Sequence, residues 1–235
     1  MSLCIITGAG AGIGKATAIE LSKQSFFDGF AILGRNAEAL AATVNEMLEN
    51  NAALKIKTYP IDLDDPDKIP EIVDSVYADF GSIDCLLNIA GYTDPQSLLL
   101  TSLDGFRKTY NVNVFSPFML MRECVKYMKN NGGKILNVAS TAGMTPRPGW
   151  LSYASSKAAL ISMSQTLTEE LAEYNIKMYC VSPGRCATDL RKKLAPDEDP
   201  TTIMQPAEVA EVIVRLISPD EKCLDGQNIV IRKKT

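Results

Sequence analysis

The stretch "LCIITGAGAGIGKATAIEL", residues 3–21, indicates the fold most clearly. Its apolar run "LCIIT" has the composition of a buried β-strand, and a helical pattern follows directly after a glycine-rich turn. Gly8, Gly12 and Gly14 follow the spacing G-x3-G-x-G rather than the stricter G-x-G-x-x-G. In such a turn the first glycine permits a tight bend, the second lets the backbone approach a pyrophosphate, and the third allows close helix-sheet packing. The stretch therefore predicts a dinucleotide-binding βα unit, the alternative being a glycine turn that binds nothing.

Further strand-like runs alternate with helical patterns along the rest of the chain. Strands are predicted near 3–7, 30–34, 54–60, 83–90, 134–140, 176–182 and 228–232, and helices near 13–25, 37–50, 67–79, 104–130, 152–174 and 206–217. This alternation implies βαβ units with right-handed crossovers. The predicted fold class is therefore α/β, a Rossmann-type doubly wound parallel sheet of seven strands with helices on both faces. Residues 1–235 are expected to form a single domain, and the polar, proline-containing segment 189–205 is expected to be a mobile loop within it.

Composition restricts the class of protein. The 235 residues are 46% hydrophobic and 22% charged, which is typical of a soluble globular protein. The net charge of −4 argues against a nucleic-acid partner. The longest apolar runs are too short to span a bilayer, and the N-terminus lacks the features of a signal peptide. We therefore expect a cytoplasmic protein without a membrane partner.

The chain contains no histidine and six cysteines, none of them in a C-x-x-C pair. Several cysteines lie in apolar runs, which favours buried thiols in a reducing compartment. The absence of histidine excludes Ser-His-Asp triads, histidine general bases and histidine-ligated zinc, and no metal site is predicted. If the protein is an enzyme, its proton chemistry must use Tyr, Lys, Asp, Glu or Cys.

The segment "SYASSKAAL", residues 152–160, offers such chemistry. Tyr153 and Lys157 are four residues apart in a predicted helix, so their side chains project from the same face. An ammonium about 5 Å from a phenol, at an effective dielectric constant of roughly 20, favours the phenolate by about 3 kcal/mol. That is roughly two pKa units, which brings a tyrosine towards the working range of an acid/base. The alternative is an ordinary helix surface.

The end of the second predicted strand bears on the choice of cofactor. NAD-binding proteins place a carboxylate there for the ribose 2′-hydroxyl, whereas this chain has Gly34 followed by Arg35. A guanidinium without a neighbouring carboxylate favours a 2′-phosphate, and the alternative is that Arg35 is a solvated loop residue. Asp62, at the end of the third strand, is expected to face the adenine, while Asp64 and Asp65 are expected to begin the next helix.

Seven motifs occur in the order of a known family: "TGAGAGIG", Asp62, "NIAG" (88–91), "NVNV" (111–114), "ILNVAS" (135–140), "YASSK" (153–157) and "SPGRCAT" (182–188). Over nearly its whole length the chain resembles the short-chain dehydrogenase/reductases in their compact single-domain form. The resemblance implies that Tyr153 is the acid/base and that Lys157 binds the nicotinamide ribose and lowers the tyrosine pKa. It further implies that Ser140 hydrogen-bonds the substrate oxygen and that Asn113 holds a water in a proton relay.

The glycine turn and the resemblance together assign a set of residues to the cofactor. Thr188 is expected near the nicotinamide carboxamide, and Asn88 is expected to support the sheet more than the chemistry. Ala11 stands where relatives that use NADP often carry a second basic residue, so a moderate preference for NADP(H) over NAD(H) is implied. The full set is Gly8, Gly12, Ile13, Gly14, Gly34, Arg35, Asn36, Asp62, Leu63, Asn88, Ala90, Gly91, Tyr153, Lys157, Pro183, Gly184 and Thr188.

The function implied is that of an oxidoreductase that transfers a hydride between NADP(H) and a ketone or secondary alcohol, with a 3-oxoacyl thioester as one candidate substrate. The alternatives are a polyol or sugar dehydrogenase and a cofactor-binding sensor without turnover. The resemblance implies a homodimer or homotetramer and a substrate lid over 189–205. Trp150 and Met144 are expected to line the substrate pocket together with the lid, the alternative for Trp150 being packing at the start of the helix. The C-terminal "RKKT" departs from the glycine-rich tail of many relatives and weakens the expectation of a tetramer.

Overall fold

A computed structural model of the chain describes residues 2–233, so Lys234 and Thr235 of the C-terminal "RKKT" lie outside the described residues. Seven strands form one parallel sheet in the order β3-β2-β1-β4-β5-β6-β7, which confirms the predicted fold class. The strand order reverses between β1 and β4, and ligands of such sheets bind in the crevice at this point. The strands are β1 (Leu3–Thr7), β2 (Gly29–Gly34), β3 (Lys55–Pro60), β4 (Cys85–Asn88), β5 (Gly133–Val138), β6 (Ile176–Pro183) and β7 (Asn228–Ile231).

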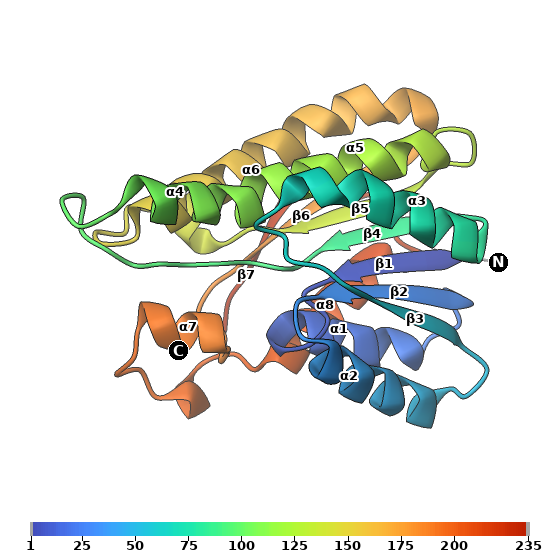
Figure 1. Cartoon of the computed structure of the whole chain (residues 1–235), viewed down its shortest axis with the longest axis horizontal. Coiled ribbons are helices and arrows are strands. Elements are labelled where there is room, and N and C mark those ends of the chain that lie inside the picture. The colour runs from blue at the N-terminus through green and yellow to red at the C-terminus, as the bar shows by residue number, and fades with distance from the viewer. Residues whose placement is uncertain (1, 234–235) are drawn as a thin grey trace.

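Helices cover both faces of the sheet (Figure 1). The helices α1, α2 and α8 pack on one face, and α3, α4, α5 and α6 lie on the other. The short helix α7 stands apart from both layers, beside the carboxyl ends of the strands. The helices are α1 (Gly12–Ser22), α2 (Ala37–Asn50), α3 (Ile69–Phe80), α4 (Leu103–Tyr110), α5 (Ser116–Met128), α6 (Leu151–Leu171), α7 (Asp189–Leu194) and α8 (Pro206–Ile217).

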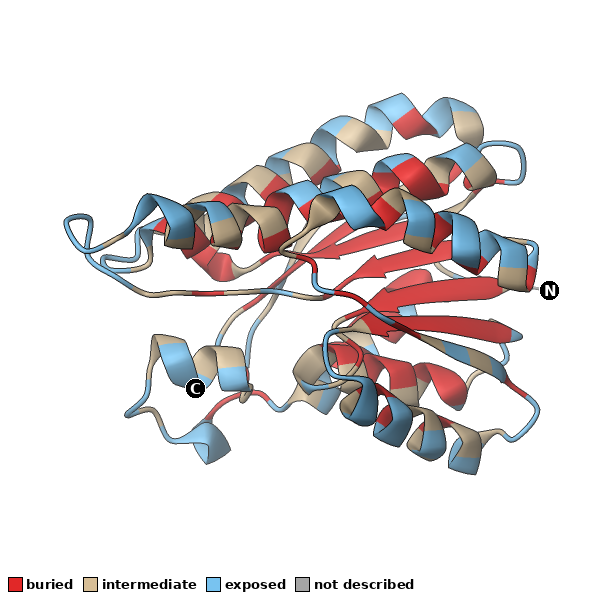
Figure 2. Cartoon of the chain, viewed as in Figure 1, coloured by how far each residue is buried: buried red, intermediate tan, exposed pale blue. Residues whose placement is uncertain are grey.

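The central strands are buried on both faces, as Figure 2 shows. Successive side chains of a strand point to opposite faces, so β1 contributes to two cores. Cys4 and Ile6 pack under α1 and α8, whereas Leu3 and Ile5 pack under α3 and α5. This double burial explains why these strands are continuous apolar runs rather than alternating patterns.

Two predicted elements differ from the structure. The predicted helix at 104–130 is interrupted by a π-helical turn, Asn111–Phe115, in which the Ser116 N–H donates to the Asn111 carbonyl. The predicted loop at 189–205 contains the helix α7 and a 3₁₀ turn, Pro200–Thr202, so the expectation of an irregular segment was wrong there. Both differences arise from local hydrogen bonding that hydrophobic periodicity does not report.

Within residues 2–233, no helix combines the length and the apolar character needed to cross a lipid bilayer.

Candidate active site

The turn between β1 and α1 is packed so tightly that only glycine fits at two of its positions. A Cβ atom on Gly14 would lie 2.2 Å from the carbonyl oxygen of Gly8, and one on Gly8 would lie 2.9 Å from Cα of Ala90. Gly8 and Gly12 also have positive φ angles of 70° and 55°. The N-cap residue of α1 is Ala11, which provides no capping side chain, so the first N–H groups of this helix are free of a side-chain cap. These features suit a phosphate at the helix N-terminus.

A cleft of about 1360 Å³ runs from this turn across the carboxyl ends of the strands. It exceeds the roughly 300–1,000 Å³ of ordinary small-molecule sites, so it has room for a dinucleotide together with a substrate. All but one of the residues predicted to contact the cofactor line it, namely Gly8, Gly12, Ile13, Gly14, Gly34, Arg35, Asn36, Asp62, Leu63, Ala90, Gly91, Tyr153, Lys157, Pro183, Gly184 and Thr188. The glycine turn and the cleft therefore fit a nicotinamide dinucleotide.

Asn88 is the exception, because it does not line the cleft. Its Nδ2 donates a hydrogen bond of 2.9 Å to Oδ1 of Asn137, which in turn donates from Nδ2 to Ser164 Oγ at 2.9 Å. This buried chain of polar side chains joins β4, β5 and α6. The structure thus gives Asn88 a sheet-supporting position outside the lining of the cleft, and its cofactor contact stays a prediction.

Tyr153 and Lys157 are four residues apart on α6, and both line the cleft. Tyr153 is 6% exposed and Lys157 is 2% exposed. The Lys157 ammonium donates to the Val138 carbonyl at 2.8 Å and lies 6.0 Å from the centroid of the Tyr153 ring. The two residues therefore form the buried tyrosine-ammonium pair that their spacing predicts.

Ser140 follows β5 and faces the same pair. Its Oγ accepts a hydrogen bond from the Ala142 N–H at 3.1 Å, which fixes the side chain at the start of a 3₁₀ turn. The Ser140 hydroxyl also favours the phenolate of Tyr153 and so opposes part of the rise in its pKa that burial causes. Ser140, Tyr153 and Lys157 thus all line one end of the cleft.

The protonation of the pair differs from the expectation. Burial raises the pKa of Tyr153, and the hydroxyl of Ser140 and the charge of Arg191 oppose this only in part. Burial also lowers the pKa of Lys157, to about 8. The net shift of the Tyr153 pKa in this structure is therefore upward, because the cost of desolvating the phenolate is the largest contribution, whereas the resemblance implies a lowering by Lys157.

Asn113 lies beside the pair but does not line the cleft. Its Oδ1 accepts from the Tyr92 N–H at 2.8 Å, and its Nδ2 donates to the Tyr92 carbonyl at 2.9 Å and to Ser156 Oγ at 3.0 Å. The space above Gly91 is shared with Lys157, since Asn113 Oδ1 and Lys157 Nζ would lie 3.8 and 3.7 Å from a Cβ atom on that glycine. Both amide hydrogens are thus engaged in the protein, whereas Oδ1 keeps one acceptor site beyond the Tyr92 contact, so the expected water relay stays a prediction.

At the opposite end of the cleft, β2 leads into Gly34, Arg35 and Asn36. Asn36 caps α2 by accepting from the Ala39 N–H at 3.0 Å, and Arg35 is exposed. Among the described residues no carboxylate forms an ion pair with Arg35. Glu38, in the first turn of α2, lines the same end of the cleft and was not foreseen.

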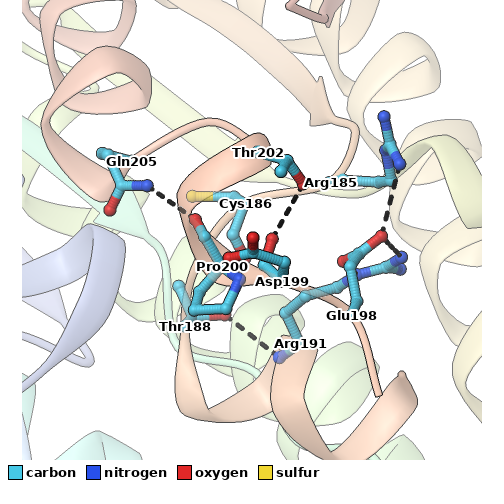
Figure 3. A network of polar contacts seen from close by, with 9 residues as sticks. All are labelled: Arg185, Cys186, Thr188, Arg191, Glu198, Asp199, Pro200, Thr202 and Gln205. Atoms are coloured by element: carbon cyan, nitrogen blue, oxygen red, sulfur yellow. Dashed lines mark hydrogen bonds and ion pairs between the residues drawn. The ribbon is translucent and has the colours of Figure 1, made fainter. Parts of the chain in front are cut away.

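The segment expected to form a lid is held together by Glu198 (Figure 3). Arg191 donates from Nε to Glu198 Oε2 at 2.6 Å and from Nη2 to Oε1 at 2.8 Å, and Arg185 lies 3.4 Å from the same carboxylate. Thr188 caps α7, with its Oγ1 accepting from the Arg191 N–H at 3.1 Å. Arg191 lines the cleft, yet the sequence provides no signal that separates it from its neighbouring lysines.

Of the residues expected to line the substrate pocket, some line the cleft and one does not. Trp150 lines the cleft, as do several residues of 189–205. Met144 does not line it, and its sulfur instead accepts a hydrogen bond from Asn228 Nδ2 at 2.9 Å.

Comparison with known proteins supports this geometry. A family model described as short chain dehydrogenase matches residues 2–199. The 3-oxoacyl-acyl-carrier-protein reductase FabG of Thermotoga maritima is 34% identical over 240 residues, which cover 97% of this chain and 95% of the relative. A solved NAD+-bound xylitol dehydrogenase is 29% identical, with a TM-score of 0.86 and 98% and 97% of the two chains covered. A short chain dehydrogenase from Burkholderia cenocepacia in complex with NADP is 27% identical, with a TM-score of 0.88 and 97% and 95% covered.

Proposed function

The chain belongs to the short-chain dehydrogenase family and is an oxidoreductase, and we propose that it transfers a hydride between NADP(H) and a ketone or secondary alcohol, with Tyr153 as acid/base. The observation that carries the proposal is that Ser140, Tyr153 and Lys157 line the same cleft as the glycine turn. A cleft that binds a dinucleotide thus has a proton donor at one end, and no histidine is needed.

In this proposal the bound nicotinamide supplies or accepts the hydride. Tyr153 donates a proton to the substrate oxygen during reduction, and its raised pKa keeps the phenol protonated at neutral pH. Ser140 orients the same oxygen through its hydroxyl. Lys157 holds the nicotinamide ribose and supports the phenolate once the proton has left.

For the cofactor we propose NADP(H) in preference to NAD(H). Arg35 is exposed at the end of β2 and has no carboxylate partner among the described residues, so its guanidinium is available to a 2′-phosphate. The relative from Burkholderia cenocepacia was solved with NADP, which agrees, whereas the xylitol dehydrogenase was solved with NAD+. Glu38 lines the same end of the cleft and limits the strength of the preference.

For the substrate we propose a 3-oxoacyl thioester, because the Thermotoga maritima relative is a reductase of that class and matches almost the whole chain. A polyol or sugar is the second candidate, favoured by the likeness to xylitol dehydrogenase. We also propose a cytoplasmic homo-oligomer. Leu98, Leu99 and Leu100, which are 72%, 94% and 71% exposed, form an apolar patch that a second copy would cover.

The test is a screen for turnover in which the absorbance of the reduced nicotinamide is the readout. NADPH or NADH is offered with a 3-oxoacyl thioester or simple ketones, and NADP+ or NAD+ is offered with polyols. We expect NADPH-dependent reduction of the thioester or the ketones. Oxidation of polyols alone would support the second candidate. Tight cofactor binding without turnover on the whole panel would instead indicate a sensor.

A further inference from the structure

Two guanidinium groups lie against the ring of Trp150 at the catalytic end of the cleft. Arg191 approaches from the lid helix α7, with its Cζ 5.6 Å from the ring centroid. Arg147 approaches from the loop before α6, with its Cζ 5.9 Å from the same centroid. All three side chains line the cleft. The mechanism described above uses none of them.

Arg191 lies near the proposed acid/base, Tyr153, with Trp150 as their common neighbour. The Trp150 ring meets the Tyr153 ring edge to face, with the centroids 6.5 Å apart, so Trp150 neighbours both the guanidinium and the phenol ring. Burial raises the pKa of Tyr153, and the positive charge of Arg191 opposes that rise in part, in keeping with this proximity. A substrate whose oxygen reaches Tyr153 would therefore extend towards Arg191.

The balance of charge at this end of the cleft is cationic, although the whole chain carries a net charge of −4. The acidic side chain of this region that lines the cleft is Asp189, since Glu38 and Asp62 line the other end. Glu198 does not line the cleft and binds Arg191 from the lid side (Figure 3). The cationic side chains of this region that line it are Arg147, Lys157, Arg185, Arg191 and Lys193.

Hydrogen-bonding capacity remains unused on both arginines. Glu198 occupies Nε and Nη2 of Arg191, and a guanidinium has five N–H donors, so further donors are free. Arg147 forms no ion pair with any described residue.

We propose that Arg191, assisted by Arg147, determines specificity by binding an anionic group that the substrate carries close to its carbonyl. This inference rests on the proposed function, and it narrows the substrate class to carbonyl compounds that bear a carboxylate or a phosphate. Trp150 and Glu198 position Arg191, because the ring stacks on the guanidinium and the carboxylate fixes one of its edges. The anion binds the remaining donors.

The anion has two chemical sources, which matched substrates distinguish. The first pair is 3-oxobutanoate and its neutral methyl ester, which differ in the carboxylate. The second pair is dihydroxyacetone phosphate and dihydroxyacetone, which differ in a phosphate close to the carbonyl. We expect the charged member of one pair to have a kcat/KM at least about 10-fold above the neutral member, mainly through KM.

Substitution of Arg191 then tests its role. Arg191→Met should lower kcat/KM for the preferred charged substrate by about 10- to 150-fold, and by less than about 3-fold for its neutral partner. Arg191→Lys should retain part of the activity, because it keeps the positive charge but lacks the paired N–H donors of the guanidinium. Lys192→Met is the matched control, since Lys192 is an exposed neighbour on α7 that does not line the cleft, and it should leave both rates unchanged.

Binding is measured separately in a Tyr153→Phe background with NADPH, by calorimetry of the same four compounds. This readout does not depend on turnover, so it reports on the anion site even if the wild type reduces no carbonyl. Equal affinity and equal kcat/KM for charged and neutral members would overturn the proposal. An equal loss on both members in Arg191→Met would also overturn it, since that result indicates a purely structural role in the lid.

Discussion

The ammonium of Lys157 donates a hydrogen bond of 2.8 Å to the backbone carbonyl of Val138. This contact joins α6 to the end of β5 and holds the charge 6.0 Å from the centroid of the Tyr153 ring. Both partners are buried, so water competes little with the contact. The position of the cation therefore depends on the protein scaffold, and the following predictions test what it contributes.

Removal of the phenolic proton should abolish most of the turnover. Tyr153→Phe keeps the ring and its packing but has no proton to donate, so kcat should fall by at least about 10²-fold. Cofactor affinity, measured by fluorescence titration, should remain nearly unchanged. Tyr77→Phe is the matched control, because Tyr77 is exposed on α3 and does not line the cleft. Retention of most of the activity in Tyr153→Phe would show that another group donates the proton.

Removal of the ammonium should have two effects, since one group is assigned two tasks. Lys157→Ala should lower kcat and should also weaken cofactor binding, because the ribose contact is lost together with the support of the phenolate. Steady-state kinetics and titration of the cofactor separate these effects. A fall in kcat with unchanged cofactor affinity would show that Lys157 does not bind the nicotinamide ribose.

The buried ammonium should also affect stability above neutral pH. The pKa of Lys157 is about 8 in the folded protein and 10.5 when unperturbed, so the unfolded chain binds more protons between these values. Stability should therefore rise with pH across this window, by up to about 3 kcal/mol for the shift of 2.5 units. In Lys157→Met that rise should be missing from urea denaturation series, whereas the exposed-site control Lys129→Met should follow the wild type. If the free energy of unfolding depended on pH in the same way in Lys157→Met and in the wild type, the lowered pKa of Lys157 would be contradicted.

The preference for NADP(H) should depend on the end of β2. A charge-assisted contact from Arg35 to a 2′-phosphate is typically worth about 1.5–3 kcal/mol, or roughly 10- to 150-fold in affinity. Gly34→Asp should reverse the preference, since a carboxylate repels the phosphate and binds the free ribose hydroxyls. A Cβ atom there would lie 3.3 Å from Leu40 Cδ2, a side-chain contact that a small shift relieves. The ratio of kcat/KM for the two cofactors measures the effect, and a wild-type preference for NADH would refute the role of Arg35.

The segment 189–205 should become more ordered when ligands bind. It is polar, and α7 and the 3₁₀ turn bury little apolar surface of their own. Hydrogen exchange of its amides should be faster than that of β1, β4 and β5 in the free protein, and slower after NADP(H) and substrate are added. Equal exchange with and without ligands would count against a closing lid.

The sequence alone determined the alternation of strands and helices along the chain, the glycine turn and the tyrosine-lysine pair. Each of these is a local pattern: apolar periodicity, a glycine that accepts a positive φ angle, or two side chains one helical turn apart. For this reason the fold class was predicted before the structure and is confirmed by the seven-stranded parallel sheet.

The tertiary structure decided the features that depend on residues far apart in the sequence. The π-helical turn at Asn111–Phe115 engages Asn113 with Tyr92, and α7 brings Arg191 against Trp150. The direction of the Tyr153 pKa shift was also beyond the sequence, because spacing reports the nearby ammonium but not the depth of burial. Desolvation and electrostatic interactions sum over every neighbour in three dimensions, and those neighbours are known only once the chain has folded.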